Sequence, residues 1–115
     1  MNIQKVFVSI NARDFSGLSQ WYRTLLERDW DREPVPSCHE WDIAGCVLFQ
    51  VLDNPKQAGA ATATFHISDL DKQVERLKEA GFDVPEPQHV EGFDNLRYCE
   101  FKDPEGNTVG LVEGS

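Results

Sequence analysis

Two ionisable side chains, Glu113 and His66, lie on predicted strands at positions where they could take part in catalysis. Glu113 ends a stretch in which Val109, Leu111 and Glu113 fall on the same side of a predicted strand. His66 alternates with threonines along another predicted strand. A carboxylate and an imidazole on a concave apolar surface suit general acid–base work, because partial removal from water shifts their pKa values. Glu113 and His66 are therefore the candidate catalytic residues.

Apolar periodicity predicts the elements that must position these side chains. A helix begins after Asp14 with an apolar stripe at Leu18, Trp21, Tyr22 and Leu25. A second helix begins near Ser68, with Asp71 completing a capping box. Gly81 is a typical residue for the end of that helix. Strands are predicted over residues 5–11, 38–43, 46–52, 61–67, 82–84, 96–102 and 108–112, with a short edge strand within 30–36.

The order strand, helix, three strands occurs twice, so we interpret the chain as an internal duplication of a βαβββ unit. An offset of about 55 residues pairs Asp14 with Asp69 and Tyr22 with Leu77. We expect a single domain of 115 residues, with a first unit over 1–54 and a second over 60–115, joined by a short linker.

A tandem βαβββ chain that ends in DPEGNTVGLVE (residues 103–113) resembles the vicinal oxygen chelate superfamily, which includes glyoxalase I, the bleomycin-resistance proteins and the extradiol dioxygenases. The resemblance extends to Asp14 followed by the aromatic pair Trp21 and Tyr22, and to SDLDKQVERLKEAGF over 68–82. It implies an α+β fold in which two tandem βαβββ units form a curved sheet cup.

The resemblance also implies four positions for metal ligands, which correspond here to Phe7, Gln50, Thr62 and Glu113. Glu113 matches and the amide oxygen of Gln50 can coordinate, but Phe7 has no donor atom and Thr62 offers only a neutral hydroxyl. We therefore predict no bound metal and no cofactor. Another zinc cluster, built from the 38–46 region with its two cysteines and one histidine, lacks any standard spacing.

The cup face predicted by alternation has an aromatic ring, aliphatic groups, small hydroxyls, an amide, an imidazole and a carboxylate, a mixture that is typical of ligand sites. The predicted ligand-binding residues are Phe7, Ser9, Asn11, Leu48, Gln50, Thr62, Thr64, His66, Leu111 and Glu113. The alternative is that side chains fill the cup, with Glu113 bonded to Gln50 or to water.

Composition and net charge restrict the classes of partner that the protein can bind. A net charge of −9 argues against nucleic acid and anionic membranes as partners, because phosphate binding depends on clustered Lys and Arg. Three cysteines without CxxC spacing indicate reduced thiols, and the first residues lack the apolar segment of a signal peptide, so we expect a cytoplasmic protein. Sheet edges and apolar faces that need cover favour a homodimer.

Three classes of function remain open. The first is a metal-independent binder of a small organic molecule, as the bleomycin-resistance proteins are. The second is a lyase, isomerase or dioxygenase of the same superfamily, with an altered metal site or with acid–base chemistry through Glu113 and His66. The third is an interaction module. The residues at Phe7 and Thr62 favour the first class.

Overall fold

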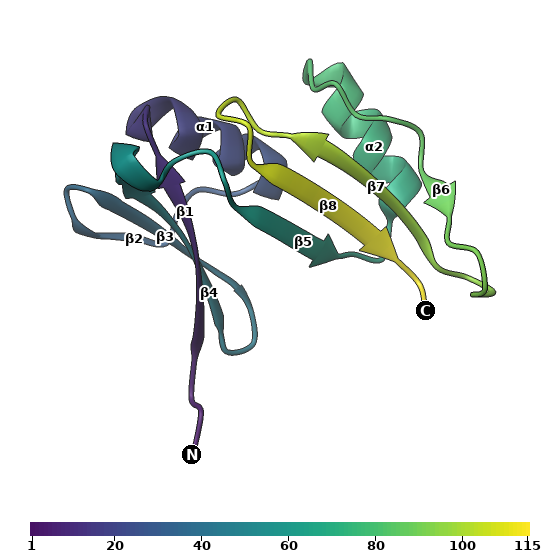
Figure 1. Cartoon of the computed structure of the whole chain (residues 1–115), viewed down its shortest axis with the longest axis horizontal. Coiled ribbons are helices and arrows are strands. Elements are labelled where there is room, and N and C mark those ends of the chain that lie inside the picture. Colours follow the sequence, from purple (N-terminus) through teal and green to yellow (C-terminus); the bar gives the residue numbers. More distant parts are fainter. The chain divides into compact units, whose positions relative to one another are not determined.

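The computed structural model describes all 115 residues and contains two helices and two four-stranded mixed sheets (Figure 1). Residues 1–61 and 104–106 form one compact unit, and residues 62–103 and 107–115 form the other. Each unit follows the order strand, helix, three strands. The predicted α+β class with two tandem βαβββ units is therefore confirmed.

The first unit carries a sheet in the order β1-β4-β3-β2, in which β1 and β4 run parallel and the other neighbours are antiparallel. A 3-10 turn (Pro55–Gln57) follows the last strand. The elements are β1 (Val6–Ala12), α1 (Phe15–Leu26), β2 (Arg32–Val35), β3 (Cys38–Ala44) and β4 (Val47–Asp53).

The second unit repeats this arrangement in the order β5-β8-β7-β6, again with one parallel pair, β5 and β8. Its elements are β5 (Thr62–His66), α2 (Leu70–Glu79), β6 (Gln88–His89), β7 (Arg97–Lys102) and β8 (Thr108–Glu113). The predicted strand over 82–84 is wrong: pairing starts only at Gln88. The segment before it contains Pro85 and Pro87, which lack amide hydrogens and restrict φ.

Helix α1 begins where the sequence predicts. The Asp14 carboxylate accepts a hydrogen bond from the Gly17 amide at 3.1 Å, which satisfies a free N–H of the first turn. Glu105, one of the residues that group with the first unit, accepts from the amides of Arg13 and Asp14 at 2.6 and 2.8 Å. The helix ends at Glu27, which has a left-handed φ of 58°.

The apolar stripe of α1 packs against one face of the first sheet. Leu18, Tyr22 and Leu25 are buried on the helix, and Tyr22 contacts the ring of Phe49 with the centroids 5.0 Å apart. Trp41 lies beside Phe49 on the same face and donates its indole N–H to a backbone carbonyl. This face of the sheet is therefore the core of the first unit.

Helix α2 begins differently from the prediction. Asp69, rather than Ser68, precedes its first turn and makes no side-chain cap to the backbone. Asp71 does not complete a capping box, because its carboxylate is engaged by both terminal nitrogens of Arg97. Gly81 follows the helix with a φ of +92°, as predicted for this residue. No helix in the structure is long and apolar enough to cross a membrane.

Candidate functional site

Five of the predicted ligand-binding residues share one face of the first sheet. Phe7 pairs directly with Leu48 and Ser9 with Gln50, while Asn11 follows two residues further along β1. Directly paired residues project from the same face of a sheet, and here it is the face opposite α1. We call it the helix-free face of the first sheet. The structure thus brings these five residues together, while their role in binding stays a prediction.

A continuous chain of hydrogen bonds crosses this face over all four strands. Ser9 Oγ donates to Gln50 Oε1 at 2.8 Å, and Gln50 Nε2 donates to Glu40 Oε2 at 2.7 Å. The other oxygen of Glu40 accepts from Arg32 Nη1 at 3.2 Å, and Arg32 is also ion-paired with Asp42. The polar groups therefore orient one another instead of pointing separately into water.

Among the four residues that form this chain of hydrogen bonds, Glu40 is the most deeply buried, with 8% of its surface exposed. The Arg32 guanidinium and the Gln50 amide compensate for the removal of its carboxylate from water. In return, Asp42 and then Glu40 raise the pKa of Arg32 above its ordinary value. Burial, and secondly the Glu40 carboxylate, raise the pKa of the Cys38 thiol, so this cysteine is protonated and a poor nucleophile.

Sequence reasoning missed Glu40 and Arg32. Alternation along the predicted strand over 38–43 does place Cys38, Glu40 and Asp42 on one face, and this was the available signal. The signal is weak because an acidic residue on an edge-proximal strand usually faces water. Only the pairing with Arg32 on β2 and Gln50 on β4 explains why Glu40 lies inside.

The remaining residues of this face differ in exposure. Phe7 is 57% exposed and borders Ser9 on the same side of β1, whereas Leu48 is buried. The side-chain oxygen of Asn11 accepts a hydrogen bond from Asn54 Nδ2 at 3.2 Å. An exposed aromatic ring thus lies next to the polar pair of Ser9 and Gln50.

The second sheet divides the predicted residues between its two faces. Thr64 pairs with Gly110 on β8, and Thr62 and His66 share their face, which is the helix-free face of the second sheet. Leu111 pairs with Phe65 and therefore lies on the side of α2. The prediction that Leu111 and Glu113 share the face of the threonines is wrong, because the register places them one residue out of phase.

Glu113 has a structural partner on the helix side. Its carboxylate accepts a hydrogen bond from the Leu70 amide at 2.7 Å, which satisfies a free N–H at the start of α2. Gln50, which the sequence analysis named as an alternative partner of Glu113, is engaged within its own unit by Ser9 and Glu40. A negative charge at a helix N-terminus is also stabilised by the helix dipole.

The two candidate catalytic residues do not converge. His66 lies on the helix-free face of the second sheet, where Nε2 is 2.8 Å from the carbonyl oxygen of Gly114. Glu113 lies on the opposite face of the same sheet, against Leu70. Two groups on opposite faces cannot act on the same substrate atom, so the geometry gives no acid–base pair.

The positions implied for metal ligands do not fit a metal ion. Phe7 presents only carbon atoms, Thr62 only a hydroxyl, and the carboxylate of Glu113 is turned toward α2. On β8, the positions that do face the side of Thr62 are Thr108, Gly110 and Val112, none of which has a carboxylate. No group of three or more His, Cys, Asp and Glu side chains is arranged to hold a metal.

His39 is buried and hydrogen-bonded through both ring nitrogens. Its ring lies between Phe15 and Trp30, with centroids 4.4 and 3.7 Å away. Nδ1 is 2.7 Å from Ser19 Oγ and Nε2 is 2.9 Å from Glu33 Oε1. Ser19 has no exposed surface, so this serine–histidine–carboxylate arrangement has no access to a substrate and stabilises the fold.

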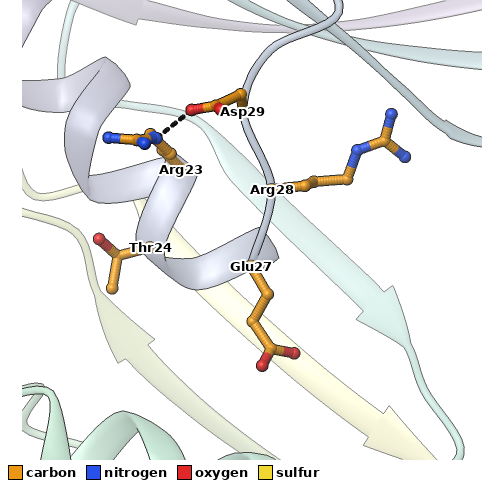
Figure 2. A pocket seen from close by; sticks show the side chains of 5 residues that line it. All are labelled: Arg23, Thr24, Glu27, Arg28 and Asp29. Atoms are coloured by element: carbon orange, nitrogen blue, oxygen red, sulfur yellow. Dashed lines mark ion pairs between the residues drawn. The ribbon is translucent and has the colours of Figure 1, made fainter.

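Two surface depressions do not include Phe7, Ser9 or Gln50 in their lining. One of about 330 Å³ lies at the end of α1, and Figure 2 shows that its side chains diverge: Arg23 turns to Asp29, while Arg28 and Glu27 point away from that pair. Ligand sites need polar groups that converge, so we exclude this depression. Another of about 410 Å³ lies in the second unit, next to Pro85 and Phe101.

Comparison with known proteins agrees with this architecture. A family model described as a glyoxalase-like domain matches residues 7–112. The chain belongs to the glyoxalase-like domain family. This family is part of the vicinal oxygen chelate superfamily, so the predicted superfamily is confirmed. A search of curated proteins finds no significant match.

Solved structures of the same fold include several members of this superfamily. A glyoxalase/bleomycin resistance protein from Catenulispora acidiphila is 23% identical with a TM-score of 0.85, over 98% of this chain and 100% of that one. TnmS3, an antibiotic binding protein from Streptomyces, is 22% identical with a TM-score of 0.78, over 100% and 97% of the two chains. A bleomycin-binding protein complexed with bleomycin is 15% identical with a TM-score of 0.76, over 99% and 100%. At these identities the likeness establishes the fold.

Proposed function

We propose that this glyoxalase-like protein binds a small organic molecule, without a metal ion, on the helix-free face of the first sheet. The observation that carries the proposal is the exposed ring of Phe7 beside Ser9 and Gln50, whose polar groups are fixed by neighbours. An apolar surface with a few oriented polar groups is the usual composition of a ligand site. Two proteins of the same fold, a bleomycin-binding protein and an antibiotic binding protein, support the proposal by analogy.

Asn11 and Leu48 belong to the same surface as Phe7, Ser9 and Gln50. Thr62, Thr64 and His66 lie on the helix-free face of the second sheet and form a separate set of predicted contacts, with hydroxyl and imidazole groups. An enzymatic role as a lyase, isomerase or dioxygenase has less support, because Glu113 and His66 lie on opposite faces and the implied ligand positions lack donors.

The test is a chemical-shift titration of the 15N-labelled protein with small aromatic molecules, after elemental analysis has established its metal content. We expect binding to shift the amide signals of Phe7, Ser9 and Gln50, and Ser9→Ala to weaken it about threefold, as for one neutral hydrogen bond. Glu79→Gln, at the exposed end of α2, serves as the control and should not change affinity. Shifts confined to other regions, or one tightly bound metal per chain, would contradict the proposal.

We further propose that the protein is a cytoplasmic homodimer. Strands β1 and β5 form edges of their sheets, and the side chain of Val6 on β1 is 47% exposed. Edge strands present unpaired backbone groups that proteins commonly cover by pairing. Sedimentation equilibrium at micromolar concentration should give twice the chain mass, and a monomer mass would refute the dimer.

A further inference from the structure

We propose that Glu40 sets the direction of the hydrogen bond between Ser9 and Gln50, and that this face thereby selects planar ligands bearing a neutral amide or lactam. This inference rests on the proposed function, since it names the ligand class of the same surface. Glu40 does not contact the ligand in this account. It is a positioning residue that acts through Gln50.

The first step concerns the side-chain amide of Gln50, whose oxygen and nitrogen could in principle exchange places. Gln50 Nε2 lies 2.7 Å from Glu40 Oε2, and a carboxylate oxygen can only accept a hydrogen bond there. The reversed amide would place two oxygen atoms against each other inside a poorly hydrated site. Glu40 is itself held in place by Arg32 at 3.2 Å, so the amide has one favourable orientation.

The second step concerns Ser9. With the Gln50 oxygen fixed toward it, Ser9 Oγ must use its single proton for the 2.8 Å bond to Gln50 Oε1. The hydroxyl then offers only lone pairs to a ligand, and so acts as an acceptor. Gln50 keeps its second N–H, which is a donor. The pair therefore presents an acceptor and a donor side by side.

The third step derives the complementary ligand. A neutral amide or lactam offers one donor and one acceptor with similar spacing, so it can satisfy both groups at once. A carboxylate offers only acceptors and would meet the lone pairs of Ser9. An amidinium offers only donors, so the second N–H of Gln50 would have no acceptor on the ligand. The exposed ring of Phe7, beside Ser9, suits a planar ring on the ligand.

Three probes of the same size separate these cases: benzamide, benzoate and benzamidine. Chemical-shift titration should give benzamide a dissociation constant about fivefold lower than either other probe, which corresponds to about one neutral hydrogen bond. The signals of Phe7, Ser9 and Gln50 should move. The side-chain NH2 signals of Gln50 report the amide directly.

The decisive variant is Glu40→Gln, and its matched control is Asp42→Asn. Each removes one negative charge beside Arg32, but only Glu40 bonds to Gln50. In Glu40→Gln the new amide can donate to Gln50, so Gln50 can reverse and Ser9 can donate. The preference for benzamide over benzoate should fall to within about twofold, while Asp42→Asn should keep it. Circular dichroism and the spread of amide signals check that both variants are folded.

The outcomes separate the two proposals. If none of the probes moves the signals of Phe7, Ser9 or Gln50, the proposed binding function of this face fails, and the ligand class fails with it. If benzoate or benzamidine binds as tightly as benzamide, the ligand class is wrong while the binding function stands. If both variants change the preference equally, charge alone governs selectivity and the positioning role of Glu40 is refuted.

Discussion

The helix-free faces of the two sheets use the same backbone plan for different purposes. In the first sheet the middle residue of β1 on this face, Ser9, pairs with Gln50 and forms a hydrogen bond. In the second sheet the middle residue of β5, Thr64, pairs with Gly110, which has no side chain that could form a hydrogen bond with the threonine hydroxyl. A methyl group added at Gly110 would lie 2.9 Å from the Thr64 hydroxyl, so the threonine already takes that space.

Two glutamates with structural partners, one in each unit, show the same contrast. Glu40 faces the helix-free side of the first sheet and orients polar neighbours, whereas Glu113 faces α2 and satisfies the Leu70 amide. The comparison teaches that a repeated fold does not repeat a site. Register decides which face each side chain reaches, and a single position of difference turns a potential ligand contact into a helix cap.

The largest effect is expected from Gly110→Ala. The new methyl group would meet Thr64 Oγ1 at 2.9 Å and Cγ2 at 3.2 Å, and the branched threonine has little freedom to rotate away. We expect a loss of about 2 kcal/mol in the free energy of unfolding, measured by urea denaturation. Adding Thr64→Ala should restore most of it. If Gly110→Ala were as stable as the wild type, Thr64 would not fill the space beside Gly110, and the proposed difference between the two helix-free faces would be refuted.

Smaller losses in the free energy of unfolding are expected from variants at the starts of the two helices. The comparison predicts that the variant at α2 loses more than the variant at α1. Glu113→Ala should cost about 1.5 kcal/mol, because Asp69 makes no cap of its own and the Leu70 amide loses its partner. Asp14→Ala should cost less, about 1 kcal/mol, because Glu105 still accepts from two amides at the start of α1. Urea denaturation of both variants measures the difference. The reverse order would contradict the assignment of Glu113 as the main cap of α2.

The smallest effect concerns acid stability. The guanidinium of Arg97 lowers the pKa of Asp71, and the backbone amide of Asp42, followed by the guanidinium of Arg28, lowers the pKa of Asp31. A carboxyl whose pKa is lower in the folded state adds stability above its unfolded pKa and loses it as pH falls through the folded pKa. Stability should therefore decline below about pH 4, and Asp71→Asn or Asp31→Asn should each flatten part of that decline.

The dependence of these two stability effects on salt concentration distinguishes Asp71 from Asp31. The pair of Asp71 with Arg97 is exposed, so 1 M salt, where the screening length is only about 3 Å, should remove the effect of Asp71→Asn. Asp31 also accepts from the Asp42 backbone amide at 2.6 Å, so the effect of Asp31→Asn should persist. Equal salt dependence of the two variants would show that both depend on their arginines alone.

Much of the fold follows from local patterns in the sequence. The alternation in β1 and β4, the Asp14 cap and the stripe of α1 each depend on residues that are neighbours along the chain, and all three are confirmed. Such features need no knowledge of distant partners. The second half was predicted less well where prolines or competing side chains intervened, as at Pro85 and Asp71.

The candidate site was predicted only in part, for a physical reason. Along β8, Val109, Leu111 and Val112 are apolar on both faces, so alternation alone cannot tell which face carries Glu113. The pairing of Phe65 with Leu111 decides it, and this is a contact between distant segments. Glu40 was missed for the same reason, because its burial depends on Arg32 and Gln50.

The place of Glu105 in the first unit has a consequence for how such a chain can be divided. Residues 104–106 group with residues 1–61, although they lie in the turn between β7 and β8, so the first unit is not one continuous stretch of sequence. A gene fragment that stopped after Ala61 would encode α1 without the acceptor that holds the amides of Arg13 and Asp14. Such a fragment would leave those two exposed amides to water, so α1 would start without a charged acceptor, and the first unit cannot be excised intact as one continuous segment of the sequence.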